Sequence, residues 1–363
     1  MRIDQVLVSA SPGDAITDFA LELQRLLVDA GVTGSGLFAR YFAPELAGRV
    51  QPLSDYAGRT GAAPDVDVMA FHASIGEPEV ADFVAAARER LVVAYHNISP
   101  AAAFRPYDPE FAAKLEEGRR ELARLQPRAS QALAVSEFNA AELRQAGYRD
   151  VRVLPLIVDP ARLAGVEPHP PTVAHLDTEV EGPVALFVGQ LLPHKRPDWL
   201  LEAYHLLVTY LSPDTHLILV GPARLARYRA AIQAQVNELN LDRAWVAGPV
   251  PVEGLAAFYR RADVFITASE HEGFCVPLLE AMSFGLPVVA RRFAAIPETA
   301  GQAALLLEPG DGPTVAAEAL AAVLGPARRP TRDLLVERGR RRLEDFDVAT
   351  ARAAWVEALL GAA

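Results

Sequence analysis

The chain has 363 residues, of which 51% are hydrophobic, and its 46 acidic residues outnumber its 35 lysines and arginines to give a net charge of −11. Since domains hold roughly 100 to 200 residues, this length predicts two of them, and the negative charge disfavours nucleic acid as the main partner. No stretch approaches the roughly 18 uninterrupted apolar residues that a membrane-spanning helix needs, so we expect no transmembrane span.

The amino terminus places Asp4 and Gln5 where a secretory signal would need apolar residues, and we predict a buried strand there instead. The single cysteine, Cys275, excludes an internal disulfide. The histidines show no Cys/His spacing that is typical of a zinc site. We therefore expect a cytoplasmic protein without a bound metal.

Short apolar runs alternate with amphipathic stretches in the first half of the chain, which is typical of βαβ units in a parallel sheet covered by helices on both faces. We expect one Rossmann-like domain over residues 1–160. Its predicted strands cover residues 3–8, 36–38, 66–71, 91–95, 132–135 and 151–154. Its predicted helices cover residues 15–30, 77–90, 109–125 and 140–146.

The alternation stops after Asp159 and resumes after Pro183. Prolines at 168, 170, 171 and 183 surround a polar, acidic stretch. Because proline is not accepted inside a helix or a central strand, we predict an irregular linker over residues 161–183.

A second doubly wound domain is predicted over residues 184–330. Its predicted strands cover residues 184–188, 216–220, 245–246, 264–267, 287–290 and 303–307, and its helices include 224–239, 255–261 and 277–284. Residues 331–363 are expected to form helices that pack back toward the amino-terminal domain. Four arginines between Arg338 and Arg342 predict a solvated helix face, with peripheral contact to an anionic membrane as the alternative.

The densest group of polar residues runs from Ser269 to Met282, between a predicted strand and a predicted helix. Ligands bind at this edge of a doubly wound sheet. Pro277 is typical of the first helical position, so the backbone N–H groups from Gly273 to Leu278, Phe274 among them, are expected to form an anion site.

Two carboxylates, Glu272 and Glu280, flank the predicted anion site. Carboxylates beside a phosphate make chemical sense when they bind hydroxyl groups, such as those of a sugar or a ribose. The segment therefore indicates a ligand that combines phosphate with a sugar.

The segment EGFCVPLLEAMSFGLPVVA resembles the E-x7-E segment of the retaining GT-B glycosyltransferases of family 4. The resemblance extends, in the family's order, to AYHNISP, VSEFNAAELRQAGY, VRVLPLIVDP, LFVGQLLPHKRPDWLLEA and AIPETAGQAALLLEPGD. It implies an α/β GT-B fold, in which two Rossmann-like doubly wound parallel-sheet domains face a cleft.

The resemblance also implies roles for single residues. Glu280 would bind the ribose hydroxyls of a nucleotide sugar, and Glu272 would contact the transferred sugar. The backbone N–H groups of Cys275 and Val276 would contact the diphosphate, which Lys195 would neutralise.

Two histidines follow predicted strands in the amino-terminal half. By resemblance, His96 would face the transferred sugar, with a buried histidine satisfied by backbone as the alternative. His72 is read mainly as such a buried histidine.

Gly189 is followed by Gln190, whereas family members usually carry arginine there, so Lys195 would hold the diphosphate with less help. His194 or Arg196 could compensate, although Arg196 could equally be a solvated residue at a helix start. Gly189, Gln190 and Arg196 are all expected to lie at the donor site.

Cys275 stands where many relatives have glycine, which predicts a local backbone regular enough for an L-residue. At a helix amino terminus its thiol would be activated toward alkylation, and the alternative is a buried, inert cysteine. By resemblance, the domain over residues 1–160 would bind the acceptor. Its loop from Ser11 to Asp14 has one glycine where the family often has two, so the resemblance does not define how the acceptor is bound.

By resemblance, the chain would be a metal-independent, retaining enzyme without a cofactor, which moves a hexosyl group from a UDP- or GDP-sugar to a hydroxyl acceptor. The alanine- and arginine-rich composition suggests a high-GC bacterium. The alternatives are a non-catalytic nucleotide-sugar-binding protein and a nucleotide-sugar epimerase of the same architecture. Phosphorolysis would need a lysine that holds pyridoxal phosphate, for which the sequence offers no clear context.

Overall fold

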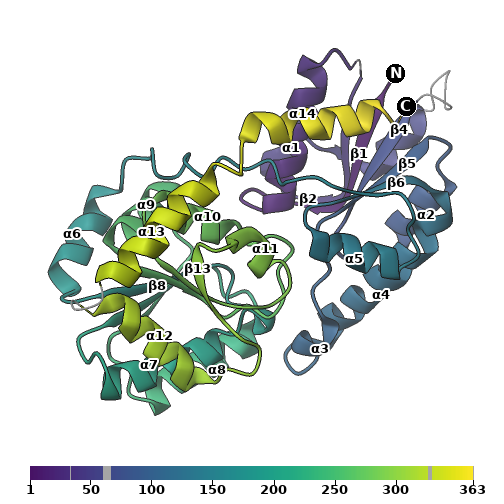
Figure 1. Ribbon diagram of the computed structural model, residues 1–363. Coiled ribbons are helices and arrows are strands. Elements are labelled where there is room, and N and C mark those ends of the chain that lie inside the picture. The colour runs from purple at the N-terminus through teal and green to yellow at the C-terminus, as the bar shows by residue number, and fades with distance from the viewer. Residues whose placement is uncertain (33, 60–66, 326–328, 363) are drawn as a thin grey trace. The chain divides into compact units, whose positions relative to one another are not determined.

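The computed structural model describes residues 1–32, 34–59, 67–325 and 329–362, and the chain divides into two compact units (Figure 1). The amino-terminal unit consists of Met1–Arg105, Pro109–Ile157 and Val348–Ala363. The carboxyl-terminal unit consists of Pro106–Asp108 and Val158–Asp347. Each unit is a parallel sheet with helices packed around it, so the predicted α/β class is confirmed.

The amino-terminal unit is built on a sheet in the order β3-β2-β1-β4-β5-β6-β7, in which every described pairing is parallel. The strands are β1 (Ile3–Ala10), β2 (Leu37–Phe42), β3 (Gln51–Pro52), β4 (Val68–Ala73), β5 (Arg90–Tyr95), β6 (Ala129–Ala134) and β7 (Val151–Val153). The helices are α1 (Ala15–Asp29), α2 (Pro78–Ala86), α3 (Ala101–Phe104), α4 (Pro109–Leu125), α5 (Glu137–Gln145) and α14 (Val348–Leu360).

The buried strand predicted at the amino terminus is confirmed as β1, which lies between β2 and β4. Its polar residues Asp4 and Gln5 are both 0% exposed. Asp4 accepts a hydrogen bond from the N–H of Gly36 at 2.7 Å and pairs with Arg2 at 3.0 Å. These partners offset the cost of burying a carboxylate. The predicted strand 66–71 starts at Val66, which lies outside the described residues.

The carboxyl-terminal unit has a sheet in the order β10-β9-β8-β11-β12-β13, again parallel in every described pairing. Its strands are β8 (Val184–Val188), β9 (His216–Val220), β10 (Ala244–Gly248), β11 (Val264–Thr267), β12 (Val288–Arg291) and β13 (Ala304–Leu307). Its helices are α6 (Pro170–Glu179), α7 (Pro197–Tyr210), α8 (Ala226–Glu238), α9 (Val252–Arg261), α10 (Val276–Ser283), α11 (Ile296–Ala300), α12 (Pro313–Leu324) and α13 (Arg329–Leu343).

The prediction of an irregular linker over residues 161–183 is wrong for α6, which lies inside it. Pro170 and Pro171 occupy the first turn of this helix, where a backbone N–H has no intrahelical partner and proline is tolerated. The helix buries Leu176, packs against α9, and is tied to the start of α9 by a hydrogen bond of 3.0 Å from the N–H of His169 to the carbonyl of Glu253.

The two last helices belong to different units. Helix α13 packs against α10, and a Cβ atom at Gly339 would lie 3.2 Å from Cγ of Met282. Helix α14 lies beside α1 (Figure 1) and buries Trp355, whose indole N–H donates to the carbonyl of Pro155 at 2.8 Å. Within the described part of the chain, no helix is both long and apolar enough to cross a membrane.

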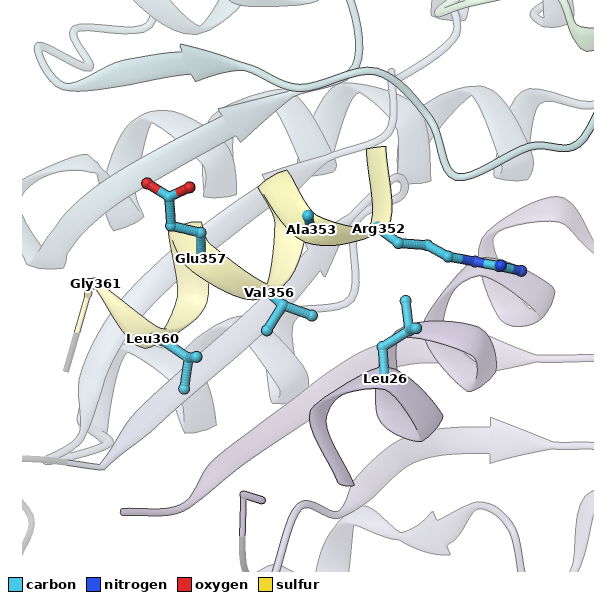
Figure 2. A pocket seen from close by; sticks show the side chains of 7 residues that line it. All are labelled: Leu26, Arg352, Ala353, Val356, Glu357, Leu360 and Gly361. Carbon is cyan, nitrogen blue, oxygen red and sulfur yellow. The ribbon is translucent and has the colours of Figure 1, made fainter. Parts of the chain in front are cut away.

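A surface pocket lies between α1 and α14 (Figure 2). It is lined by Leu26 of α1 and by Arg352, Ala353, Val356, Glu357, Leu360 and Gly361. Leu26 is in the last turn of α1, whereas the strands' carboxyl edge lies at the other end of this helix, where Asp14 caps its first turn. Leu26 therefore places the pocket at the end of α1 that is opposite to the carboxyl edge of the first sheet.

Candidate functional site

The strand order of the second sheet runs outward in one direction from β8 to β10 and in the other direction from β11 to β13. The strands β8 and β11 at this switch point are adjacent and parallel, with Ala185 opposite Val264. In doubly wound sheets, the loops that follow the two strands at such a point are where ligands bind. Here these loops cover residues 189–196 and 268–275. All residues predicted for this part of the site lie in the two loops, except Val276 and Glu280 in α10.

The two loops meet through Lys195 and Glu272. The Nζ atom of Lys195 lies 2.5 Å from Oε1 of Glu272, and the two side chains are only 17% and 12% exposed. Burial disfavours the charged lysine, but the Glu272 carboxylate outweighs this effect and raises the pKa of Lys195 above its usual value. The structure thus brings together the predicted phosphate-binding cation and the predicted sugar-binding carboxylate.

Three hydrogen bonds hold the second loop in place. The N–H of Glu270 donates to the carbonyl of His194 at 2.8 Å, which joins the second loop to the first. The carbonyl of Glu272 accepts from the N–H of Ala295 at 3.2 Å, and the carbonyl of Phe274 accepts from the hydroxyl of Thr299. Gly273 lies between these two anchored residues.

Helix α10 begins at Val276, so Pro277 is its second residue, whereas the sequence predicted the first. Proline is tolerated throughout the first turn, so the pattern alone could not separate the two positions. The N–H groups of Cys275 and Val276 precede the first intrahelical hydrogen bond and can bind an anion. The N–H of Leu278 instead donates to the carbonyl of Cys275 at 3.1 Å.

The backbone of Cys275 is left-handed, with φ of 71° and ψ of 63°, so the expectation of a regular L-residue conformation here is wrong. This conformation favours glycine. The side chain is 7% exposed, and burial followed by the Glu272 carboxylate raises the pKa of the Cys275 thiol well above its usual range. The structure therefore favours the inert cysteine over the activated one, because desolvation exceeds the attraction of Lys195 and the helix terminus for a thiolate.

Gly189 follows β8 directly and has φ of 156°, and its N–H donates to the carbonyl of Val220 at 2.9 Å. A Cβ atom at Gly221 would lie 2.1 Å from the carbonyl oxygen of Gly189, which no side chain could tolerate. Gly221 is thus required for the path of the first loop, in which Gln190 is half-buried. Gly221 was not predicted as part of the site. Its position directly after the predicted strand 216–220 could have indicated a close backbone approach.

Glu280 lies in α10 with its side chain half-buried, and Oε2 accepts a hydrogen bond of 2.9 Å from the hydroxyl of Tyr259. Burial raises the pKa of Glu280, while this hydrogen bond opposes the rise. Tyr259 is 0% exposed and stacks on Phe284, with ring centroids 5.0 Å apart. The role of Tyr259 was not predicted from the sequence, because its contact with Glu280 arises only when α9 and α10 meet in the fold.

Arg196 is part of an ion-pair network. The structure thus does not favour the alternative in which Arg196 is a solvated residue at a helix start. Its guanidinium contacts Asp198 at 3.1 Å and Glu270 at 2.5 Å. Glu270 also pairs with Arg291 at 2.7 Å, and Arg291 is 5% exposed, with its guanidinium carbon 4.8 Å from the ring centroid of Trp199. Arg291 was missed because it directly follows the predicted strand 287–290, and the structure places it as the last residue of β12.

In the amino-terminal unit, the structure brings together the two histidines singled out from the sequence. His96 follows β5, whereas His72 lies within β4, which extends two residues beyond the predicted strand. Nδ1 of His72 lies 2.8 Å from Nε2 of His96, and Nε2 of His72 lies 2.9 Å from Oε1 of Gln5. Burial lowers the pKa of His96 to about 4 and that of His72 well below its usual range, so both rings are neutral near pH 7.

Known proteins are similar in sequence to the carboxyl-terminal unit. Residues 182–325 match the family model described as glycosyl transferases group 1. O-antigen chain mannosyltransferase B of Escherichia coli is 36% identical over 138 residues, which cover 38% of this chain and 35% of that protein. A D-inositol 3-phosphate glycosyltransferase of Corynebacterium efficiens is 32% identical over 157 residues, which cover 41% of this chain and 36% of the relative. The chain thus matches about a third of the length of these curated relatives.

The whole chain resembles solved structures of GT-B glycosyltransferases. The crystal structure of Anabaena Alr3699/HepE in complex with UDP and glucose superposes with a TM-score of 0.76 and 19% identity, covering 99% of this chain and 100% of the other. At this identity the likeness shows the fold, and the predicted GT-B architecture is confirmed.

Proposed function

We propose that this chain, whose residues 182–325 match the glycosyl transferases group 1 family model, is a retaining glycosyltransferase that moves a hexosyl group from a UDP- or GDP-sugar to a hydroxyl acceptor. The observation that carries the proposal is the contact between Lys195 and Glu272 at the β8/β11 edge, beside the start of α10. A cation and free N–H groups suit a diphosphate, and a carboxylate within reach of that cation suits sugar hydroxyls.

Cleavage of a glycosyl phosphate bond places negative charge on the leaving diphosphate. Fixed donors that face this charge stabilise the transition state more than the bound substrate. We assign this role to Nζ of Lys195 and to the N–H groups of Cys275 and Val276, with Gln190 as an uncharged donor. We propose that these groups act without a metal or another cofactor.

Lys195 and Glu272 are partners of each other in the structure. Neither group can be left buried without a partner at low cost. We propose that the diphosphate takes over Lys195 while hydroxyls of the transferred sugar take over Glu272, so both charges keep partners when the nucleotide sugar binds.

The remaining roles are part of the same proposal. Glu280 binds the ribose, with Oε2 held by Tyr259, and His96 contacts the transferred sugar. We further propose a cytoplasmic bacterial enzyme of glycan, glycolipid or metabolite biosynthesis, since its one cysteine is free and buried.

The proposal is tested first by thermal unfolding in the presence of UDP-, GDP-, ADP- and TDP-sugars. A ligand at 100 times its dissociation constant adds about 2.7 kcal/mol to the free energy of unfolding. The stabilising sugar nucleotide is then incubated with the protein, with and without EDTA, and the released nucleotide and any isomerised sugar are measured. Release of nucleotide supports transfer, binding without release identifies a non-catalytic binder, and isomerisation without release identifies an epimerase.

A further inference from the structure

Gln5 is held in one amide orientation at the centre of the amino-terminal sheet. Its side chain is 0% exposed, and its Nε2 lies 3.0 Å from the carbonyl oxygen of Ala20 in α1. A carbonyl oxygen only accepts hydrogen bonds, so the atom that faces Ala20 must be the amide nitrogen. The amide oxygen of Gln5 therefore faces Nε2 of His72 at 2.9 Å.

This orientation determines where the proton of His72 lies. An amide oxygen only accepts, so Nε2 of His72 must donate and carries the proton. His72 is 1% exposed, and its pKa is lowered first by burial and then by His96, so the ring carries one proton and not two. Its Nδ1 atom is then left with a lone pair.

The position of the proton on His72 also determines that on His96. Nδ1 of His72 lies 2.8 Å from Nε2 of His96, and the two ring planes differ by only 16°. Nearly coplanar rings let the N–H of one point along the lone pair of the other. Since Nδ1 of His72 can only accept, Nε2 of His96 must donate, and the proton of the neutral His96 ring is not on Nδ1.

The rings are also fixed in place by aromatic packing. Phe19 of α1 meets both imidazoles edge-on, with its centroid 5.2 Å from His96 and 6.0 Å from His72. Trp355 of α14 packs against Phe19 at 4.7 Å. Both Phe19 and Trp355 are buried, so rotation of His96 away from His72 would open a gap in this cluster.

We propose that Gln5 and His72 are positioning residues that hold His96 in the neutral tautomer protonated on Nε2, so that its Nδ1 atom is a hydrogen-bond acceptor for a ligand hydroxyl. That this hydroxyl belongs to the transferred sugar rests on the proposed function. The tautomer itself does not, because it follows from the hydrogen bonds within the amino-terminal unit.

The tautomer is measured on the full chain labelled with ¹⁵N-histidine, by two-bond ¹H–¹⁵N correlation spectra near pH 7. Signals of the two residues are assigned by their loss in His72→Asn and His96→Asn. Two neutral rings, both protonated on Nε2, are the expected result. A His96 ring protonated on Nδ1, or on both nitrogens, would overturn the proposal.

Variants of the supporting residues separate positioning from general stability. His72→Leu removes the acceptor and should give His96 a mixture of tautomers, whereas His72→Asn places Oδ1 near the former Nδ1 position and should retain the Nε2–H form. Gln5→Leu should likewise give His96 a mixture of tautomers. Gln24→Leu is its control, because Nε2 of Gln24 donates to the backbone carbonyl of Ser35 at 3.3 Å. An unchanged His96 spectrum in both His72→Leu and Gln5→Leu would contradict the positioning role.

Activity supplies the second measurement. His72→Leu should reduce the kcat of glycosyl transfer by about tenfold, the effect of one lost hydrogen bond, with nucleotide affinity unchanged and with recovery in His72→Asn. If no transfer occurs in any variant while the spectra show the expected tautomers, the proposed function fails and the tautomer assignment stands. If transfer occurs but His72→Leu leaves both kcat and the spectrum unchanged, the positioning role fails alone.

Discussion

The Nζ atom of Lys195 lies 2.5 Å from Oε1 of Glu272, although 77 positions separate the two residues in the chain. The contact joins the loops after β8 and β11, where the second sheet reverses its winding. The two oppositely charged side chains are mostly buried, and together they suit a ligand that offers both negative charge and hydroxyl groups.

Lys195→Ala should reduce turnover by about 10²- to 10³-fold, because it removes a fixed donor to charge that develops on the diphosphate. Lys114, the only other lysine of the chain, is exposed in α4 and supplies the matched control Lys114→Ala. Steady-state kinetics with the stabilising sugar nucleotide measures both variants. Near-normal turnover of the Lys195 variant would move the role to another residue.

Glu280→Ala should weaken nucleotide-sugar binding by about tenfold or more, since each hydrogen bond to a charged acceptor contributes about 1.5 to 3 kcal/mol. Tyr259→Phe should weaken it less, because the carboxylate remains but Oε2 is no longer held. Tyr204→Phe is the control, since it removes a buried hydroxyl that bonds to a backbone carbonyl in the same unit. Titration calorimetry that finds equal affinities for the Glu280 variant and the unmodified protein would reject the ribose assignment.

Cys275 should alkylate slowly with iodoacetamide, both with and without UDP or GDP. Burial disfavours the reactive thiolate and raises the thiol pKa, so modification must await local opening. A mass-spectrometric time course measures the rate, with unfolded protein in urea as the fast reference. Rapid labelling that nucleotide blocks would show instead an accessible thiol under the diphosphate.

The histidine pair should make the amino-terminal unit less stable in acid. The pKa of His96 is about 4 in the folded protein and about 6.5 in an unfolded chain, so between these values the unfolded chain binds more protons. The free energy of unfolding is therefore undiminished above pH 6.5 and falls as the pH decreases toward 4, by up to about 3 kcal/mol from His96.

His96→Asn should flatten this pH dependence, whereas His175→Asn, a change at an exposed histidine of α6, should not. Urea titrations at pH 7 and pH 5 can follow Trp355 in a chain whose other two tryptophans, Trp199 and Trp245, are replaced by phenylalanine. Parallel pH dependence in all three proteins would refute the expected role of His96.

Much of the fold could be predicted because buried parallel strands are short apolar runs. The predicted bounds of β8, β9 and β11 agree with the structure residue for residue. The two-residue β3 is too short to give a pattern, and α6 was hidden by prolines that its first turn tolerates. Such elements depend on packing against their neighbours more than on local composition.

The site was predictable only where chemistry and spacing coincide. Lys195, Glu272 and Glu280 were found from their loops and their charges, and the structure places all three at one edge of one sheet. The left-handed backbone of Cys275 and the support of Glu280 by Tyr259 could not be found in this way. Both depend on how distant segments meet, which a single sequence does not display.

The packing of Trp355 on Phe19 has a consequence for synthesis on the ribosome. Helix α14 belongs to the first unit and covers Phe19, yet residues 158–347 of the other unit are translated before it. The rest of the amino-terminal unit therefore leaves the ribosome while the side of Phe19 that Trp355 covers is still open. The aromatic cover over the histidine pair is thus completed only after residues 158–347 of the second unit have been translated.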